Sequence, residues 1–265
     1  MRCLNGLTRV EKKWMVCLLM LVCVAGFELR FGATPTTASE DVVRLAPSAT
    51  IETTDAPQAP EALFHLGMQY LKGGKGIRKN KPLAEHYLLL ASEAGWADAQ
   101  VQVAMLYLKA PKAKRNDVEA RRWLTQASQG GNATAQFTLA LLWIQGRGGE
   151  QAFPPAVALL KQAVNQGYIP AYTALGILYT TGQGVTPNLP LAVQYLQEAA
   201  QHQDAVALFR LGLMYQTGLG VKKNSLKALE YLHLAEKGKY RSAKKYVEAI
   251  ESQLKASHLQ KQNID

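Results

Sequence analysis

Apolar residues recur at intervals of three and four from about residue 61 to residue 260, and glycine or asparagine interrupts them at regular points. This spacing predicts amphipathic helices. The first runs from about 62 to 72 and stops at Gly73, while the second begins after Asn80 and stops at Gly95. Glycine is favoured just after a helix, and an asparagine side chain caps the first turn. The pattern therefore predicts a pair of helices joined by a short loop.

This helix pair recurs five times. A Leu-Gly, Leu-Ala or Val-Ala pair stands at 66–67, 103–104, 139–140, 175–176 and 211–212, at spacings of 37, 36, 36 and 36 residues. An aromatic residue follows four places after the first member of each pair. Such a period is typical of a solenoid. We therefore expect an all-α αα-hairpin solenoid over 61–260, with repeats at about 62–98, 99–134, 135–170, 171–206 and 207–242 and a capping helix at 243–260.

The repeated pattern A-x-x-x-L-G-x-x-Y-x-x-G-x-G-V, then N, then A-x-x-Y/W-x-x-x-A and G-x-A-D-A-Q resembles the Sel-one-like repeat family, a relative of the tetratricopeptide repeats. The resemblance covers about 62–242. It implies a right-handed superhelix that acts as an adaptor or scaffold, and it carries over no catalytic residue. Residues 109–115 replace the G-x-G loop in repeat 2, and Ala152 replaces the capping asparagine in repeat 3, so we expect irregular loops in both.

The N-terminus predicts export. Four basic residues and one acidic residue precede residue 14, and the run from 14 to 27 is entirely apolar. Its 14 residues fall short of the roughly 20 that span a bilayer. We expect a signal peptide at 1–26, or a short inner-membrane anchor, and a flexible Thr/Ala/Pro-rich linker at 27–60. With the resemblance, this indicates a bacterial protein that is periplasmic or secreted.

Composition narrows the chemistry. All three cysteines precede residue 24, the five histidines share no metal-ligand spacing, and no nucleophile motif is present. We therefore expect no enzyme activity, no metal and no cofactor, and a protein partner instead. The alternatives are a hydrolase or glycan-processing accessory enzyme built on the same repeats, which would need convergent acidic side chains, or a structural subunit of a membrane-associated machine.

The first helices of the repeats suggest a groove. One row along them varies in chemistry and the next is mostly apolar, as expected for a groove that accepts a peptide or a helix. The alternative is that the apolar row packs between neighbouring hairpins. The candidate residues are His65, Gln69, Gln102, Leu106, Thr138, Leu142, Leu178, Arg210 and Met214.

Charge suggests a second surface. The net charge is +10, and the first 60 residues are balanced, with six basic and six acidic side chains, so the excess lies beyond them. A basic edge of loops could bind anionic envelope glycan, phospholipid or an acidic protein, or simply be solvated. Nucleic acid is disfavoured because no aromatic residues interleave these loops. The edge comprises Lys75, Arg78, Lys79, Lys112, Lys114, Arg115, Lys222 and Lys223.

Overall fold

The chain is all-α in the part that the computed structural model describes, which is residues 59–74, 76–111 and 115–262. The expected signal peptide and nearly all of the expected linker lie outside these residues. The first six helices are α2 (Pro60–Lys72), α3 (Lys81–Glu93), α4 (Ala97–Lys109), α5 (Asp117–Gln129), α6 (Ala133–Gln145) and α7 (Phe153–Asn165). The other five are α8 (Ile169–Thr181), α9 (Leu189–Gln201), α10 (Ala205–Thr217), α11 (Ser225–Lys237) and α12 (Ser242–Gln262).

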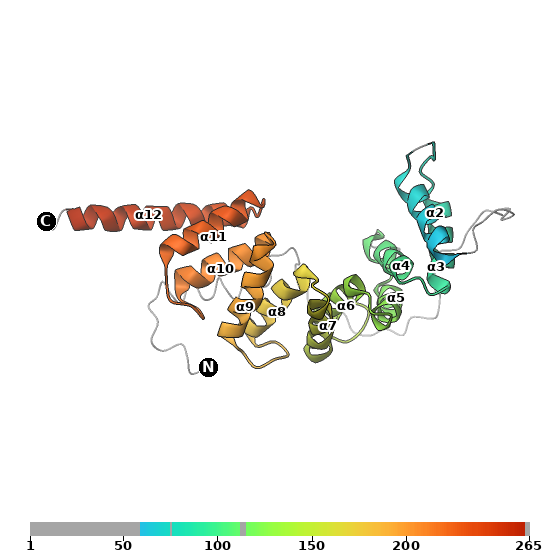
Figure 1. The fold of residues 1–265 in the computed structure, drawn as a ribbon, viewed down its shortest axis with the longest axis horizontal. Helices are drawn as coiled ribbons and strands as arrows, with labels where there is room; N and C mark the ends of the chain where they lie inside the picture. Colours follow the sequence, from blue (N-terminus) through green and yellow to red (C-terminus); the bar gives the residue numbers. More distant parts are fainter. Residues whose placement is uncertain (1–58, 75, 112–114, 263–265) are drawn as a thin grey trace.

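Consecutive helices pair into five hairpins, α2–α3, α4–α5, α6–α7, α8–α9 and α10–α11, which stack in a row (Figure 1). Each of these ten helices has 13 residues, whereas α12 has 21 and extends beyond the stack. We call the first helix of each hairpin helix A and the second helix B. The predicted solenoid of five hairpins with a terminal helix is confirmed.

Asparagine caps fix where helix B begins. Asn80, Asn116, Asn188 and Asn224 each accept a hydrogen bond from a backbone N–H in the first helical turn, as predicted. Ala152 makes no such bond before α7, also as expected. A cap of this kind stabilises a helix by about 1 kcal/mol, so four of the five B helices have a start that the sequence encodes locally.

The loops of repeats 1 and 3 differ from expectation. Repeat 3 was expected to be irregular, but Gly146 and Gly148 have φ angles of 64° and 71°, close to those of the corresponding glycines in repeats 4 and 5. Gly73 was expected to adopt the same left-handed helical conformation as Gly146. Its φ of 72° is also positive, but its ψ is 177°, whereas that of Gly146 is 25°. The one-residue insertion explains this, because it lets Gly74 and Ile77 pair through two backbone hydrogen bonds of 2.9 and 3.0 Å.

Helix B leads into the next helix A through one recurring turn. Gly95, Gly131 and Gly167 have positive φ in repeats 1 to 3. The same position in repeats 4 and 5 holds Gln203 and Lys239, which are the positive-φ residues other than glycine in the described chain, at 59° and 65°. Since left-handed backbone is unfavourable for residues with a Cβ, these two turns carry strain that the glycine turns avoid.

The core runs along the stack, both within each hairpin and between helix B of one repeat and helix A of the next. Leu160 of α7, for example, is buried with Leu175 and Leu178 of α8. One repeat later, Leu196 of α9 is buried with Leu211 and Met214 of α10 in the same way. Each hairpin therefore buries its apolar face against its neighbour, as stacked repeats do.

Polar side chains reinforce these junctions. The Gln100 side-chain amide donates to the Ser92 carbonyl at 3.2 Å, and Gln136 donates to the Ser128 carbonyl at 3.5 Å. At the next junction the Tyr172 hydroxyl donates to the Val164 carbonyl at 3.2 Å. Each of these carbonyls at the end of helix B already accepts a hydrogen bond from the backbone N–H of the turn glycine, so the side chain of the next helix A adds a second one.

The second glycine of the A–B loop is a contact between repeats in repeats 3, 4 and 5. A Cβ added to Gly220 would meet Leu189, the first residue of the preceding helix B, at 2.9 Å, and Gly184 faces Phe153 in the same way. Gly76 has nothing within 4 Å, and no described repeat precedes its own. The G-x-G motif is therefore explained by close packing between repeats as well as by turn geometry.

Both ends of the stack are polar. Gln69 is exposed at the position where later A helices bury Leu142, Leu178 or Met214 against the preceding repeat. At the other end, α12 has Glu248 where α10 has Gly212 against its own helix B, and Glu251 lies 3.6 Å from His233. This confirms the predicted terminal cap, and we expect neither end to accept a further repeat.

Candidate functional site

The expected groove is only partly exposed. His65 and Gln69 are exposed, while Gln102, Leu106 and Arg210 are half-buried. Thr138, Leu142, Leu178 and Met214 are between 2 and 8% exposed. Leu142, Leu178 and Met214 of the apolar row therefore pack in the core instead of forming an exposed floor, as the alternative of packing between hairpins expects. Thr138 of the variable row is buried as well.

A more accessible row of the A helices lies one residue before the buried apolar row. Met68, Met105, Leu141 and Ile177 occupy the same position in four successive A helices, and all four are half-buried. The row ends at Leu213, which is 2% exposed and packs in the cluster that includes α12. A helix advances 100° per residue, so adjacent positions can lie on opposite sides of a packing boundary. Sequence spacing alone places positions 68 and 69 on the same face of the first helix.

Two flanking rows complete this surface. They lie seven residues before and four residues after the apolar row, which places all three on one helix face. We call the whole surface the helix-A strip. It consists of Glu61, Met68, Lys72, Asp98, Met105, Lys109, Thr134, Leu141, Gln145, Pro170, Ile177, Thr181, Val206 and Thr217.

Charge divides the helix-A strip. In repeats 1 and 2 the methionine is flanked by an acid on one side and a lysine on the other, Glu61 and Lys72, then Asp98 and Lys109. The flanking positions of repeats 3 to 5 hold threonine, glutamine, proline or valine and no charge. The strip thus has a charged half and an uncharged half.

Hydrogen bonds between successive A helices hold the strip together at its edges. The Asn132 amide donates to Asp98 at 2.8 Å, joining the starts of α4 and α6. Gln216 donates to Gln253 at 3.2 Å, which joins α10 to α12. Side chains on neighbouring A helices therefore lie within direct contact distance, so one ligand could touch several repeats.

The basic edge is interrupted, as the uncharged stretch 171–197 predicts. Arg78, Lys79, Arg115, Lys222 and Lys223 are exposed. Lys75, Lys112 and Lys114 lie outside the described residues. The α2–α3 and α10–α11 loops lie in the two end repeats of the row (Figure 1), and residues 171–197 between them carry no charge. Within the described chain these cations form separate groups instead of one edge.

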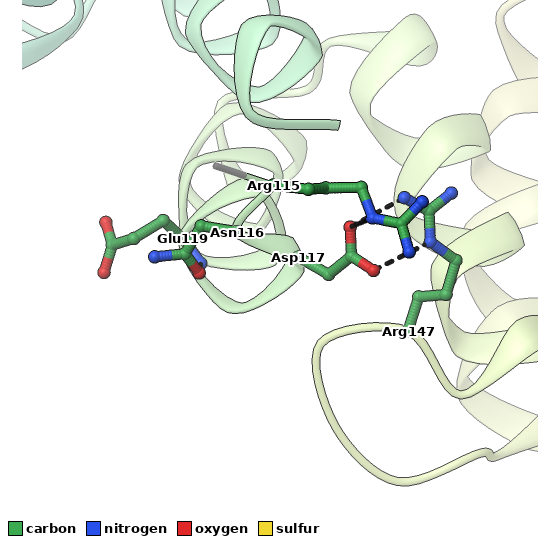
Figure 2. Close-up of polar contacts among 5 residues, drawn as sticks. All are labelled: Arg115, Asn116, Asp117, Glu119 and Arg147. Atoms are coloured by element: carbon green, nitrogen blue, oxygen red, sulfur yellow. Dashed lines mark hydrogen bonds and ion pairs between the residues drawn. The ribbon is translucent and has the colours of Figure 1, made fainter. Parts of the chain in front are cut away.

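A polar cluster joins repeats 2 and 3 (Figure 2). Arg147 in the α6–α7 loop donates two hydrogen bonds to the Asp117 carboxylate, at 3.0 and 2.6 Å, and Arg115 lies 3.6 Å from it. The hydrogen bond from Arg147 and the charges of both arginines hold the pKa of Asp117 below its ordinary value, although burial opposes them. This bidentate pair fixes the repeat-3 loop on the start of α5.

An arginine covers the aromatic residue of repeat 3. In repeats 1, 4 and 5 the helix-A tyrosine stacks on a helix-B tyrosine of its own hairpin, as Tyr179 does on Tyr195 at 5.7 Å. Leu159 takes that place in repeat 3, and the Arg121 guanidinium of repeat 2 lies 3.4 Å from the Trp143 ring centre. Burial lowers the pKa of Arg121. A cation–π contact thus replaces an aromatic stack. Together with the Arg147–Asp117 pair, it joins repeats 2 and 3 through charged side chains.

Within the described residues, no group of three or more His, Cys, Asp or Glu side chains is placed to hold a metal ion. Across the same residues, no helix has both the length and the apolar character needed to cross a bilayer.

Five stacked helical hairpins with recurring caps, core positions and junctions define an α-helical repeat solenoid of the tetratricopeptide type. The Sel1 repeat model matches residues 60–96, 97–132, 169–204 and 205–239, which together are more than half of the chain. The chain belongs to the Sel1 repeat family. These repeats are scaffolds that in general mediate protein–protein interaction and lack catalytic activity. The model leaves out residues 133–168, where the structure nonetheless has α6 and α7.

Solved structures support the same assignment. A Sel1 repeat protein from Oxalobacter formigenes is 30% identical, with a TM-score of 0.70 over 75% of this chain and 79% of that one. A protective antigen of uropathogenic Escherichia coli with an SLR fold is 22% identical, with a TM-score of 0.66 over 73% of this chain. This chain spans 41% of the antigen's length. No curated protein matches the chain.

Proposed function

We propose that this protein is a non-enzymatic scaffold that binds an uncharged peptide segment or helix face of another protein along the helix-A strip. The half-buried row of Leu141 and Ile177, flanked by uncharged side chains in repeats 3 to 5, carries this proposal. Partly exposed aliphatic groups gain free energy when a partner covers them, at about 25 cal/mol per Å². A charged ligand would lose hydration there and find no opposite charge.

The charged half of the strip supplies orientation. Glu61 and Asp98 lie on one side of the methionine row, and Lys72 and Lys109 lie on the other. A bound segment with charges at one end would meet complementary groups in repeats 1 and 2 in one direction only. Charges at the rim of an interface contribute to specificity and association rate more than to affinity.

The polar ends support a discrete binding protein. A subunit that polymerised end to end would need apolar faces at the first and last helices, whereas Gln69, Glu248 and Glu251 stand at those positions. The basic loops remain a second candidate surface for an anionic envelope component, and the helix-A strip is favoured because its apolar row runs through four successive repeats.

Export is part of the proposal and rests on the sequence before residue 27. If the signal is cleaved, the mature protein should lack the apolar run 14–27 and be recovered from the periplasm or the medium. N-terminal sequencing of the purified native protein tests this. An intact Met1 on protein recovered from the cytosol would contradict it.

The binding surface can be tested by crosslinking in cells. A photoreactive amino acid at position 177 should capture a protein that the same group at Gln194, exposed on α9, does not capture. The captured protein is then purified, and its affinity is measured for the Ile177→Asp and Gln194→Asp variants. We expect Ile177→Asp to weaken binding strongly, because it places an unpaired charge under the partner.

Circular dichroism melting separates binding from folding. Ile177 is half-buried, so its substitution should leave the melting temperature within a few degrees of that of Gln194→Asp. Wild-type affinity in Ile177→Asp, or equal loss in both variants, would rule out the helix-A strip as the binding surface.

A further inference from the structure

The turn between α11 and α12 carries the densest charge of the described chain. Lys237, Lys239, Arg241, Lys244 and Lys245 lie within nine residues, and all five are exposed. None of them forms an ion pair with another described residue. Of the nearby acids, Glu236 and Glu251 lie 3.9 and 3.6 Å from His233, and Glu248 on α12 forms no ion pair within the described chain. We call these five residues the basic tip. The candidate basic edge lies in the A–B loops, whereas this turn lies at the opposite end of helix B.

The basic tip is rigidly mounted. Tyr240 packs on Phe209 with ring centres 4.6 Å apart, and Ala243 is fully buried. The backbone N–H of Tyr240 donates to the Ala235 carbonyl at 3.0 Å. The residues between the cations therefore hold the turn against the core, and the charges project from a fixed platform at the last repeat.

Two of these cations stand where the helix itself disfavours them. Lys244 and Lys245 lie in the first turn of α12, which contains no acidic residue. The N-terminus of a helix carries partial positive charge, so cations there raise the free energy of the folded state. An anionic partner would relieve this repulsion together with that among the five side chains.

We propose that the basic tip docks the solenoid onto an anionic phospholipid bilayer. Lysine is depleted from protein–protein interfaces, whereas lysine clusters are attracted to anionic membranes by about fivefold in affinity per cation. Leu234, 44% exposed on α11 and three residues before Lys237, lies on the same helix face and can contact the interfacial region. The site is separate from the helix-A strip, and the proposal is independent of the function assigned to that strip.

The test uses residues 59–265, which contain the whole solenoid with its polar ends and continuous core. This shortened protein lacks the apolar run near the N-terminus, so that run cannot contribute to vesicle binding. We expect sedimentation with phosphatidylcholine vesicles only when they contain phosphatidylglycerol. Lys239→Glu/Arg241→Glu/Lys244→Glu should weaken binding by about 100-fold or more. The matched control, Lys81→Glu/Lys161→Glu/Lys227→Glu, changes three exposed cations outside the basic tip, the basic edge and the helix-A strip. It has the same net charge and should bind much more tightly. Equal loss in both variants, or equal binding to vesicles without phosphatidylglycerol, would overturn the proposal.

A variant with uncharged substitutions distinguishes loss of vesicle binding from loss of folding. Lys244→Gln/Lys245→Gln relieves the unfavourable interaction with the helix dipole, so its melting temperature should equal or exceed that of the wild type. Vesicle affinity should nevertheless fall by about 25-fold. If affinity is unchanged while an acidic peptide such as poly-glutamate binds the wild type and not this variant, the basic tip is a protein-binding site and the lipid proposal is wrong.

Discussion

Exchanging glycine and glutamine between two equivalent turns should change stability in opposite directions. Gly167 and Gln203 lie 36 residues apart at the same position after helix B, with φ of 73° and 59°. Nothing lies within 4 Å of a Cβ added at Gly167. The exchange therefore alters backbone preference without creating a clash, and we expect Gln203→Gly to stabilise the protein and Gly167→Gln to destabilise it.

The magnitude follows from two opposing contributions. A left-handed backbone costs a residue with a Cβ about 1–2 kcal/mol. Glycine in turn loses about 0.5–1 kcal/mol more conformational entropy on folding. The difference is about 0.5–1 kcal/mol per site, which for a protein of this size shifts the melting temperature by roughly 1–4 °C.

Thermal denaturation followed by circular dichroism measures the global effect. Amide hydrogen exchange measures the local one, since the turns are closed by Asp204 N–H to Ala199 at 3.2 Å and Tyr168 N–H to Ala163 at 3.0 Å. The double variant should return close to the wild type, because the two turns share no contacts. If both single variants moved stability in the same direction, left-handed strain would not be the cause.

Two further predictions concern packing and charge. Gly176→Leu should destabilise the protein by roughly 3 kcal/mol or more in urea denaturation, because even a Cβ would stand 2.7 Å from the buried Leu196. The control Gln194→Leu, on exposed surface, should change stability little. Equal stability of the two variants would contradict the close packing at Gly176. The Arg147 contact lowers the pKa of Asp117 in the folded state. The contact therefore stabilises the fold fully above the ordinary carboxyl pKa of about 3.9, and this stabilisation is lost as pH falls through the lowered pKa of Asp117. Arg147→Gln should therefore show less of this acid-dependent loss in melting temperature, and an unchanged pH profile would show that the pair contributes nothing.

Most of the fold could be predicted because its determinants are local and repeated. Asn188 caps α9 through a backbone N–H three residues away, and Gly182 ends α8 in left-handed conformation. Both depend on neighbouring residues alone, so spacing revealed them. Gly73 departed because one inserted residue created a backbone pairing that no repeat average contains.

The candidate site was less accessible to sequence reasoning. Positions 68 and 69 both fall on one side of α2, and in the first repeat Gln69 is exposed. In later repeats the position of Gln69 is covered by the preceding hairpin, as the 2% exposure of Leu142 shows. Which of two adjacent rows stays accessible depends on how hairpins rotate against one another, and that rotation is a property of packing between repeats.

The polar faces of α2 and α12 restrict how the gene for this protein can lengthen by duplication. A copy of an interior hairpin, such as residues 169–204, brings Leu175 and Leu178 to meet one neighbour and Leu196 to meet the other, so it fits between two existing hairpins. The same copy placed before α2 or after α12 would set these leucines against Gln69 or Glu248. A new repeat is therefore expected to fit in the middle of the array, between two existing hairpins, and not beyond α2 or α12.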